Sequence, residues 1–187
     1  MNEIDSLAGQ LLIAMPGMTD PNFEHTVTYI CEHSDHGALG ITVNRPMNMD
    51  LAEVLQQLSL ETETPELNSQ PVLRGGPVQS ERGFVLHDSS REWDATTPIG
   101  NSISVTTSQD ILTDLAAGKG PQRVVMALGY AGWGAGQLEN EIRQNAWLTV
   151  PATQDLIFDL PFHQRWAAAA KSIGVNPASL SLQAGHA

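Results

Sequence analysis

The hydrophobic and polar positions near the start of the chain follow the patterns of short β-strands. Residues 11–15 form a short apolar run that ends at a proline, which indicates a buried strand. In 26–32 and in 38–44, apolar residues recur at every second position, and five turn-forming residues, 33–37, separate the two segments. This pattern predicts a β-hairpin. The polar face of the first of its strands has one apolar exception, Ile30.

Apolar residues at helical spacing begin further along the chain. Asp50 and Glu53 resemble a capping box ahead of apolar side chains at 51, 54, 55 and 58, which predicts a helix. Similar patterns predict helices at 107–117, 135–144 and 162–173, and strands at 71–73, 83–87, 102–106, 123–128 and 147–150. We therefore expect an α+β fold, an α/β sandwich with a mixed β-sheet, a hairpin-rich N-terminal half and helices packed on the sheet.

The length of the chain predicts one domain. A chain of 187 residues is within the usual size of a single soluble domain, so we expect one domain over 1–187. Within it we expect a flexible N-terminus at about 1–8. We also expect an exposed loop at about 59–70, which carries three glutamates and few apolar residues.

The charge of the chain disfavours two classes of partner. It has 21 acidic and 9 basic side chains, a formal net charge of -12, and only two lysines. This balance disfavours binding to nucleic-acid phosphate or to an anionic membrane surface. The chain also lacks an apolar stretch approaching the roughly 18 residues of a membrane span. With no signal-like start and a single cysteine, Cys31, we expect a cytoplasmic protein without an internal disulfide.

A glycine-rich segment at 129–136 lies between an expected strand and an expected helix. Phosphate-binding loops occur in this context, because free backbone N–H groups and a helix N-terminus attract anions. However, the glycine spacing matches neither the dinucleotide nor the P-loop pattern, and Trp133 would crowd a phosphate. Two interpretations stay open, a ligand cradle or a tight turn with close packing between helix and strand.

Cys31, His33 and His36 have a spacing that could suggest zinc. A structural zinc site needs four ligands, usually from two separated pairs, and the other histidines form no second pair. The strand pattern places Cys31 on the apolar face, where a thiol usually packs as a small hydrophobic group. We assign no metal, no cofactor and no catalytic residue, and whether Cys31 is reactive or merely buried stays open.

The arginines gather in one part of the sequence. Arg45, Arg74, Arg82 and Arg91 lie within 45–91, and three of these four stand beside a glycine or proline at a strand end. Strand ends at one sheet edge can converge, so these side chains could form an anion site on an acidic surface. The alternative is that each arginine pairs with a nearby carboxylate.

Several blocks of sequence together resemble the AlgH/YqgE family of bacterial proteins. They include LIAMP at 12–16, DPNF at 20–23, TYICEH at 28–33, GALG at 37–40, NRP at 44–46, GGPV at 75–78, RGFVLH at 82–87, TTS at 106–108, ALGYAGW at 127–133, GQLE at 136–139 and NAWL at 145–148. The resemblance implies a single α/β-sandwich domain with a mixed sheet in the bacterial cytoplasm. It supplies no catalytic residue or cofactor. The family's name reflects a proposed regulatory role.

Three functions follow from these patterns as hypotheses. The first is a non-enzymatic regulatory or protein-interaction module, whose partner is another protein. The second is a small anionic-ligand-binding protein or enzyme that uses the glycine-rich segment and nearby arginines. The third, a transcriptional regulator that binds DNA directly, is disfavoured by the charge and by the lack of a helix-turn-helix pattern. The candidate ligand- or partner-binding residues are Asn44, Arg45, Arg74, Gly75, Gly76, Arg82, Gly129, Gly132, Trp133 and Gln137.

Overall fold

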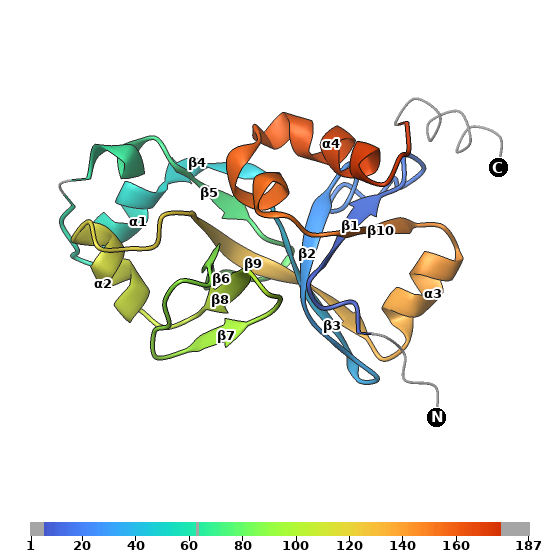
Figure 1. Ribbon diagram of the computed structural model, residues 1–187, viewed down its shortest axis with the longest axis horizontal. Helices are drawn as coiled ribbons and strands as arrows, with labels where there is room; N and C mark the ends of the chain where they lie inside the picture. The colour runs from blue at the N-terminus through green and yellow to red at the C-terminus, as the bar shows by residue number, and fades with distance from the viewer. Residues whose placement is uncertain (1–5, 63, 177–187) are drawn as a thin grey trace.

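The computed structural model describes residues 6–62 and 64–176 and confirms the α+β fold (Figure 1). Within them, ten strands form one curled sheet. Its main path runs β10 (Trp147–Pro151), β1 (Gln10–Ala14), β2 (Val27–Ser34), β3 (Gly37–Thr42), β9 (Val124–Gly134), β6 (Val78–Asp88), β8 (Ile103–Thr106) and β7 (Thr96–Pro98), with β4 (Pro46–Asp50) and β5 (Pro71–Arg74) on a branch. The helices are α1 (Leu51–Gln57), α2 (Asp110–Ala116), α3 (Gln137–Arg143) and α4 (Arg165–Ser172). Short helical turns lie at Pro65–Asn68, Asp155–Asp159 and Phe162–Gln164.

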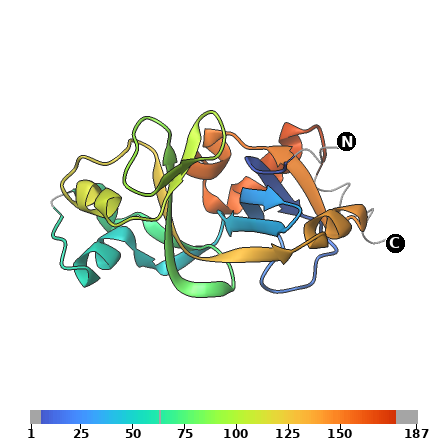
Figure 2. The same cartoon turned by 90° about the horizontal axis from the view of Figure 1, so that it is seen from below.

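Strand β9 connects the two halves of the sheet. Its first part pairs with β6 along one edge and with β5 along the other, whereas its last residues pair with β3. Figures 1 and 2 both show β9 running from the end of the molecule that holds α1 and α2 toward α3. The pairing of β5 with β9 is parallel and the other pairings are antiparallel, so the sheet is mixed, as predicted.

Both faces of the sheet are buried, and alternate residues go to opposite faces. Leu11 and Tyr29 belong to the core cluster that includes Ala169 of α4, whereas Leu12 and Ile30 belong to a second cluster with Leu138 of α3. A third cluster packs α1 and α2 against β5, β6 and β9. The face of β2 that the pattern marks as polar is therefore buried as far as Ile30, which is a core residue, and is exposed only at Glu32.

The glycine-rich segment is not a turn between a strand and a helix. Strand β9 continues through it as far as Gly134, with Ala131 and Trp133 buried, and α3 begins at Gln137. Glycines usually weaken strands, which is why this segment resembles a turn in sequence. The expected hairpin loop is also shorter than 33–37, because Ser34 pairs with Gly37 and leaves two residues between the strands.

The segments expected to be exposed or flexible have contacts with the core. In 59–70, the turn Pro65–Asn68 places Leu67 in the cluster beneath α1 and α2, with 5% of its surface exposed. Near the N-terminus, Leu7 packs against the α3 cluster, and residues 1–5 and Glu63 lie outside the described residues. None of the helices in 6–62 and 64–176 is long and apolar enough to cross a membrane.

Candidate functional site

Asn44 and Arg45, which follow β3, hold a neighbouring loop in place. Asn44 accepts the backbone N–H of Val27 and donates to the carbonyl of His25, both at 2.9 Å. The Arg45 guanidinium donates to the carbonyls of Pro21 and Asn22, both at 2.8 Å, and to that of Glu24 at 2.9 Å. Partial burial lowers the pKa of Arg45, and the nearby Glu24 carboxylate opposes this shift. Arg45 is thus engaged with backbone oxygens.

The other two candidate arginines lie on opposite edges of β9. Arg74 and Gly83 are both register partners of Leu128, one in β5 and the other in β6, so Arg74 and Arg82 are separated by the strand between them. The Arg74 charge is close enough to lower the pKa of Arg45 further. The Arg82 guanidinium lies over the rings of Phe84 and Tyr130, 4.9 and 5.9 Å from their centroids. The three arginines therefore do not converge on a single anion site.

Gly75, Gly76 and Gly129 allow two backbone segments to cross in contact. A Cβ on Gly76 would lie 2.1 Å from the carbonyl carbon of Tyr130, and a Cβ on Gly75 would lie 2.3 Å from the carbonyl oxygen of Gly129. Gly129 itself has φ +81°, and its Cβ would lie 2.5 Å from the Gly76 oxygen. These distances are far shorter than contacts that real side chains make, so the three glycines serve packing.

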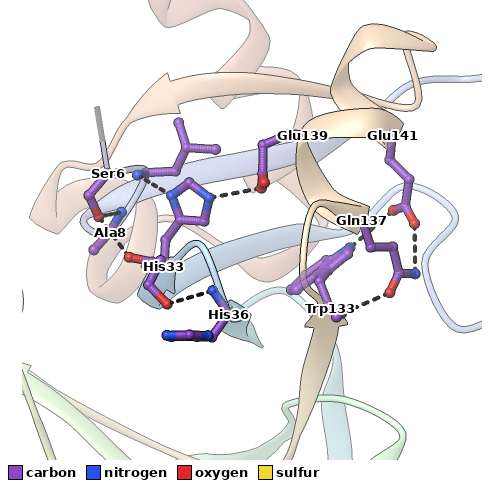
Figure 3. A network of polar contacts seen from close by, with 11 residues as sticks. Ser6, Ala8, His33, His36, Trp133, Gln137, Glu139 and Glu141 are labelled. Atoms are coloured by element: carbon purple, nitrogen blue, oxygen red, sulfur yellow. Dashed lines mark hydrogen bonds and ion pairs between the residues drawn. The ribbon is translucent and has the colours of Figure 1, made fainter. Parts of the chain in front are cut away.

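Trp133 and Gln137 belong to a polar network around Glu141 on α3 (Figure 3). The indole N–H groups of Trp133 and Trp147 donate to the same Glu141 oxygen at 3.0 and 2.9 Å. Gln137 donates to the other Glu141 oxygen at 2.9 Å and accepts the N–H of Gly134 at 3.0 Å. Trp133 is only 6% exposed and packs against Trp147, so most of its side chain lies in the core. Trp133 and its neighbour Gly132 both line an open hollow of about 580 Å³.

The cysteine and histidines of the possible zinc motif point to different surroundings. His33 accepts the N–H of Leu7 at Nδ1 and contacts Glu139 through Nε2, both at 2.9 Å (Figure 3). Cys31 is 8% exposed and directs its thiol toward the carbonyl of Tyr29, whereas His36 is exposed. Burial, with a smaller contribution from the Glu32 charge, raises the pKa of the Cys31 thiol. This thiol is therefore neutral at physiological pH and a poor nucleophile.

Two hollows flank strand β6 on its opposite faces. A groove of about 410 Å³ lies beside α1 and α2 and is lined by Glu81, Gly83 and Val85 of β6. A crevice of about 130 Å³ lies on the other face and is lined by Arg82 and Phe84. The period of two along β6 sends alternate side chains to the two hollows. Of the candidate binding residues, Arg82 is the one at the crevice, whereas the groove contains none of them.

The sequence of the whole domain matches known proteins. The profile of the AlgH-like family covers residues 11–178. A UPF0301 protein of Ralstonia nicotianae is 52% identical over 182 residues, which cover 97% of this chain and 96% of that protein. The chain belongs to the AlgH-like family. This confirms the resemblance drawn from the separate sequence blocks.

Other AlgH-like relatives and solved structures extend the match. A UPF0301 protein of Thioalkalivibrio sulfidiphilus is 51% identical over 187 residues and covers all of both chains. The solution structure of AlgH from Pseudomonas aeruginosa is 48% identical, with a TM-score of 0.79 over 100% of this chain and 99% of that one. A crystal structure from Corynebacterium diphtheriae, 21% identical, has a TM-score of 0.74 over 98% of this chain and 94% of that one, which shows the shared fold.

Proposed function

We propose that this AlgH-like chain is a non-enzymatic regulatory or protein-interaction module of the bacterial cytoplasm. Its partner would be a protein that docks an amphipathic helical segment, rich in lysine or arginine, in the groove beside α1 and α2. The observation that carries the proposal is this apolar groove of about 410 Å³ with an acidic surround.

The walls of the groove have the chemistry of a helix-binding surface. They combine Val54 and Leu58 from α1 and its end, Leu112 from α2, and the methionines Met49 and Met126. Leu58 is 39% exposed, although its place in the helical pattern predicts an inward side chain. Methionines adapt to partners of irregular shape, and helix-binding grooves take apolar residues spaced along one face of the partner.

The charges around the groove favour a basic partner. From Asp50 to Gln70 the sequence has five acidic residues and no lysine or arginine. Glu81 lines the groove itself, and its other lining residues carry no charge. Neither α1 nor α2 has a basic residue in its last turn, so these helices add no positive charge of their own at their C-terminal ends. Electrostatic complementarity of this kind speeds association and selects among partners.

The experiment compares capture by two matched surface variants. Leu58→Glu places a charge in the groove, whereas Ile173→Glu changes a side chain of equal exposure, 38%, at the end of α4. A photo-reactive residue at position 57, on the groove wall, identifies the segment that docks there. We expect crosslinked segments with a basic amphipathic helical pattern, which Leu58→Glu abolishes and Ile173→Glu retains.

Two results would contradict the proposal. One is an equal yield of crosslinked segments for both variants, with each shown to be folded by circular dichroism. The other is a set of crosslinked segments that are acidic or lack helical periodicity. Raised salt should weaken the capture, because the attraction between the acidic groove and the basic partner is screened.

A further inference from the structure

The crevice on the other face of β6 brings together two opposite charges over an apolar floor. Glu32 at the exposed end of β2 and Arg82 of β6 both line it. Leu39, Phe84 and Val105 supply apolar walls, and the hydroxyl-bearing residues Thr97 and Thr107 also line the crevice. These residues come from five separate segments, so the fold assembles the crevice where the two halves of the sheet meet.

The two charged groups are not paired with each other. Within the described residues, Arg82 has no carboxylate within 4.0 Å, and Glu32 has no cationic partner or hydrogen-bonding side chain. The guanidinium of Arg82 is held by its aromatic contacts with Phe84 and Tyr130. Stacking uses the face of the guanidinium and leaves the N–H groups in its plane to bind a carboxylate.

We propose that this crevice binds a small zwitterion of the α-amino acid class, with Arg82 holding its carboxylate and Glu32 its ammonium group. An anion alone would meet the Glu32 charge, and a cation alone would meet the Arg82 charge. A molecule that carries both charges a short distance apart satisfies both groups at once.

The volume of the crevice limits the size of the ligand. About 130 Å³ corresponds to roughly four water molecules at liquid density. Glycine, alanine or serine would fit within it, and the side chain of alanine or serine would lie against Leu39 and Val105. Cys31 also lines the crevice, and its buried neutral thiol makes the binding non-covalent.

This site is independent of the docking groove. From Glu81 to Val85 the residues of β6 alternate between the two hollows, and Thr107 is the single residue that borders both. A negative result for the zwitterion site would therefore leave the proposed interaction with a partner helix unaffected, and the reverse also holds.

The test is a titration of the isotope-labelled protein followed by NMR. Glycine and alanine should cause saturable shifts of the amide signals of Leu39, Arg82 and Thr107. Acetate, methylamine and the dipeptide glycylglycine should bind at least about tenfold more weakly, because each lacks one charge or separates the two too widely. Arg82→Gln and Glu32→Gln should each weaken glycine binding by about tenfold or more.

Matched controls separate binding from stability. Arg74→Gln and Glu66→Gln neutralise exposed charges away from the crevice and should leave binding unchanged. Ala95→Leu narrows the crevice at an exposed position while both charges remain, so it tests the site even where a charge variant fails to fold. The proposal is overturned if the amide signals do not shift with glycine or alanine up to about 10 mM. It is also overturned if acetate binds as tightly as alanine.

Discussion

His87 is a fully buried histidine whose two ring nitrogens are both hydrogen-bonded. Nδ1 lies 2.6 Å from the carbonyl of Asp88 and must donate to it, so Nε2, 2.7 Å from the Thr106 hydroxyl, accepts in the neutral ring. Thr106 in turn contacts the hydroxyl of Thr96 at 2.6 Å. Burial lowers the pKa of His87, and the hydrogen bond to Asp88 only partly opposes this shift.

This histidine should make the protein less stable in mild acid. The unfolded chain protonates His87 near its ordinary pKa of 6.5, whereas the folded protein does so only at a lower pH. The unfolded state therefore binds more protons below pH 6.5, and stability falls there by up to about 1.4 kcal/mol per pH unit. Urea unfolding between about pH 7.5 and 5.5 should show this slope in the wild type and in His36→Gln, an exposed histidine variant. Equal slopes in wild type and His87→Gln would contradict the prediction.

The burial of Arg165 could not be predicted from the sequence around it. Its side chain is 2% exposed and donates to the carbonyls of Val43, Ile157 and Leu160 at 2.6 to 2.8 Å. Burial lowers its pKa to about 10, so it remains charged at neutral pH. One of these acceptors, Val43, lies 122 residues away in the sequence, so no local signal marks Arg165 as buried. The same limit applies to the crevice, where Arg82 was a sequence candidate but Glu32 was not.

Among the elements, the crossing at Gly76 and Gly129 brings two backbone segments into direct contact. Gly76→Ala should destabilise the protein by about 3 kcal/mol, because its methyl group would overlap the backbone of Tyr130. Gly134→Ala is the matched control in β9, since its Cβ would meet no atom closer than 3.9 Å. Urea unfolding followed by tryptophan fluorescence measures both. Similar losses in the two variants would show that the crossing tolerates a side chain.

The individual elements were largely predictable because their signals are local. The capping pair at the start of α1 is present, as Asp50 accepts the N–H of Glu53 at 2.8 Å. The helix-ending glycines Gly118 and Gly174 have φ of +74° and +77°. The prediction of a turn between strand and helix at 129–136 was wrong for a physical reason. Gly129 marks close contact with a distant segment, 75–76, and local sequence cannot distinguish this from a turn.

At the scale of the whole molecule, charge repulsion opposes the folded state. The described residues contain three ion pairs, His33–Glu139, Arg91–Asp114 and Arg123–Asp159. Arg45 and Arg165 bind carbonyls instead, so most acidic side chains in the described part of the chain have no cationic partner. Of the four arginines within 45–91, Arg91 pairs with a carboxylate, whereas Arg45, Arg74 and Arg82 have no carboxylate within 4.0 Å among the described residues.

Added salt should therefore stabilise the protein. Raising sodium chloride to about 0.5 M should increase the Tm by several degrees, because screening reduces the repulsion that the net charge of -12 creates. Differential scanning calorimetry measures the effect. Neutralising the exposed Glu53, Glu61 and Glu66 to glutamine should reduce the salt dependence. A Tm that falls with salt would mean that the ion pairs outweigh the repulsion.

The fold class was predictable, but the order of strands was not. Hairpins followed by alternating helices and strands predict an α+β sandwich, and this is confirmed. However, β1 pairs with β10 at the far end of the chain, and β9 inserts between β3 and β6. Such pairings depend on which edges fit together in three dimensions, and alternation within a strand carries no information about its neighbour.

The shared strand β9 also determines how the chain can reach this structure. Neither half of the sheet is complete until residues 124–134 arrive, because β3, β5 and β6 all pair with them. Strands β3, β5 and β6 therefore keep unpaired edges until β9, which is synthesised later, pairs with them. Pairings between segments so far apart in sequence make folding slow and all-or-none. A chain cut before β9 would have open edges and would aggregate rather than fold as a smaller domain.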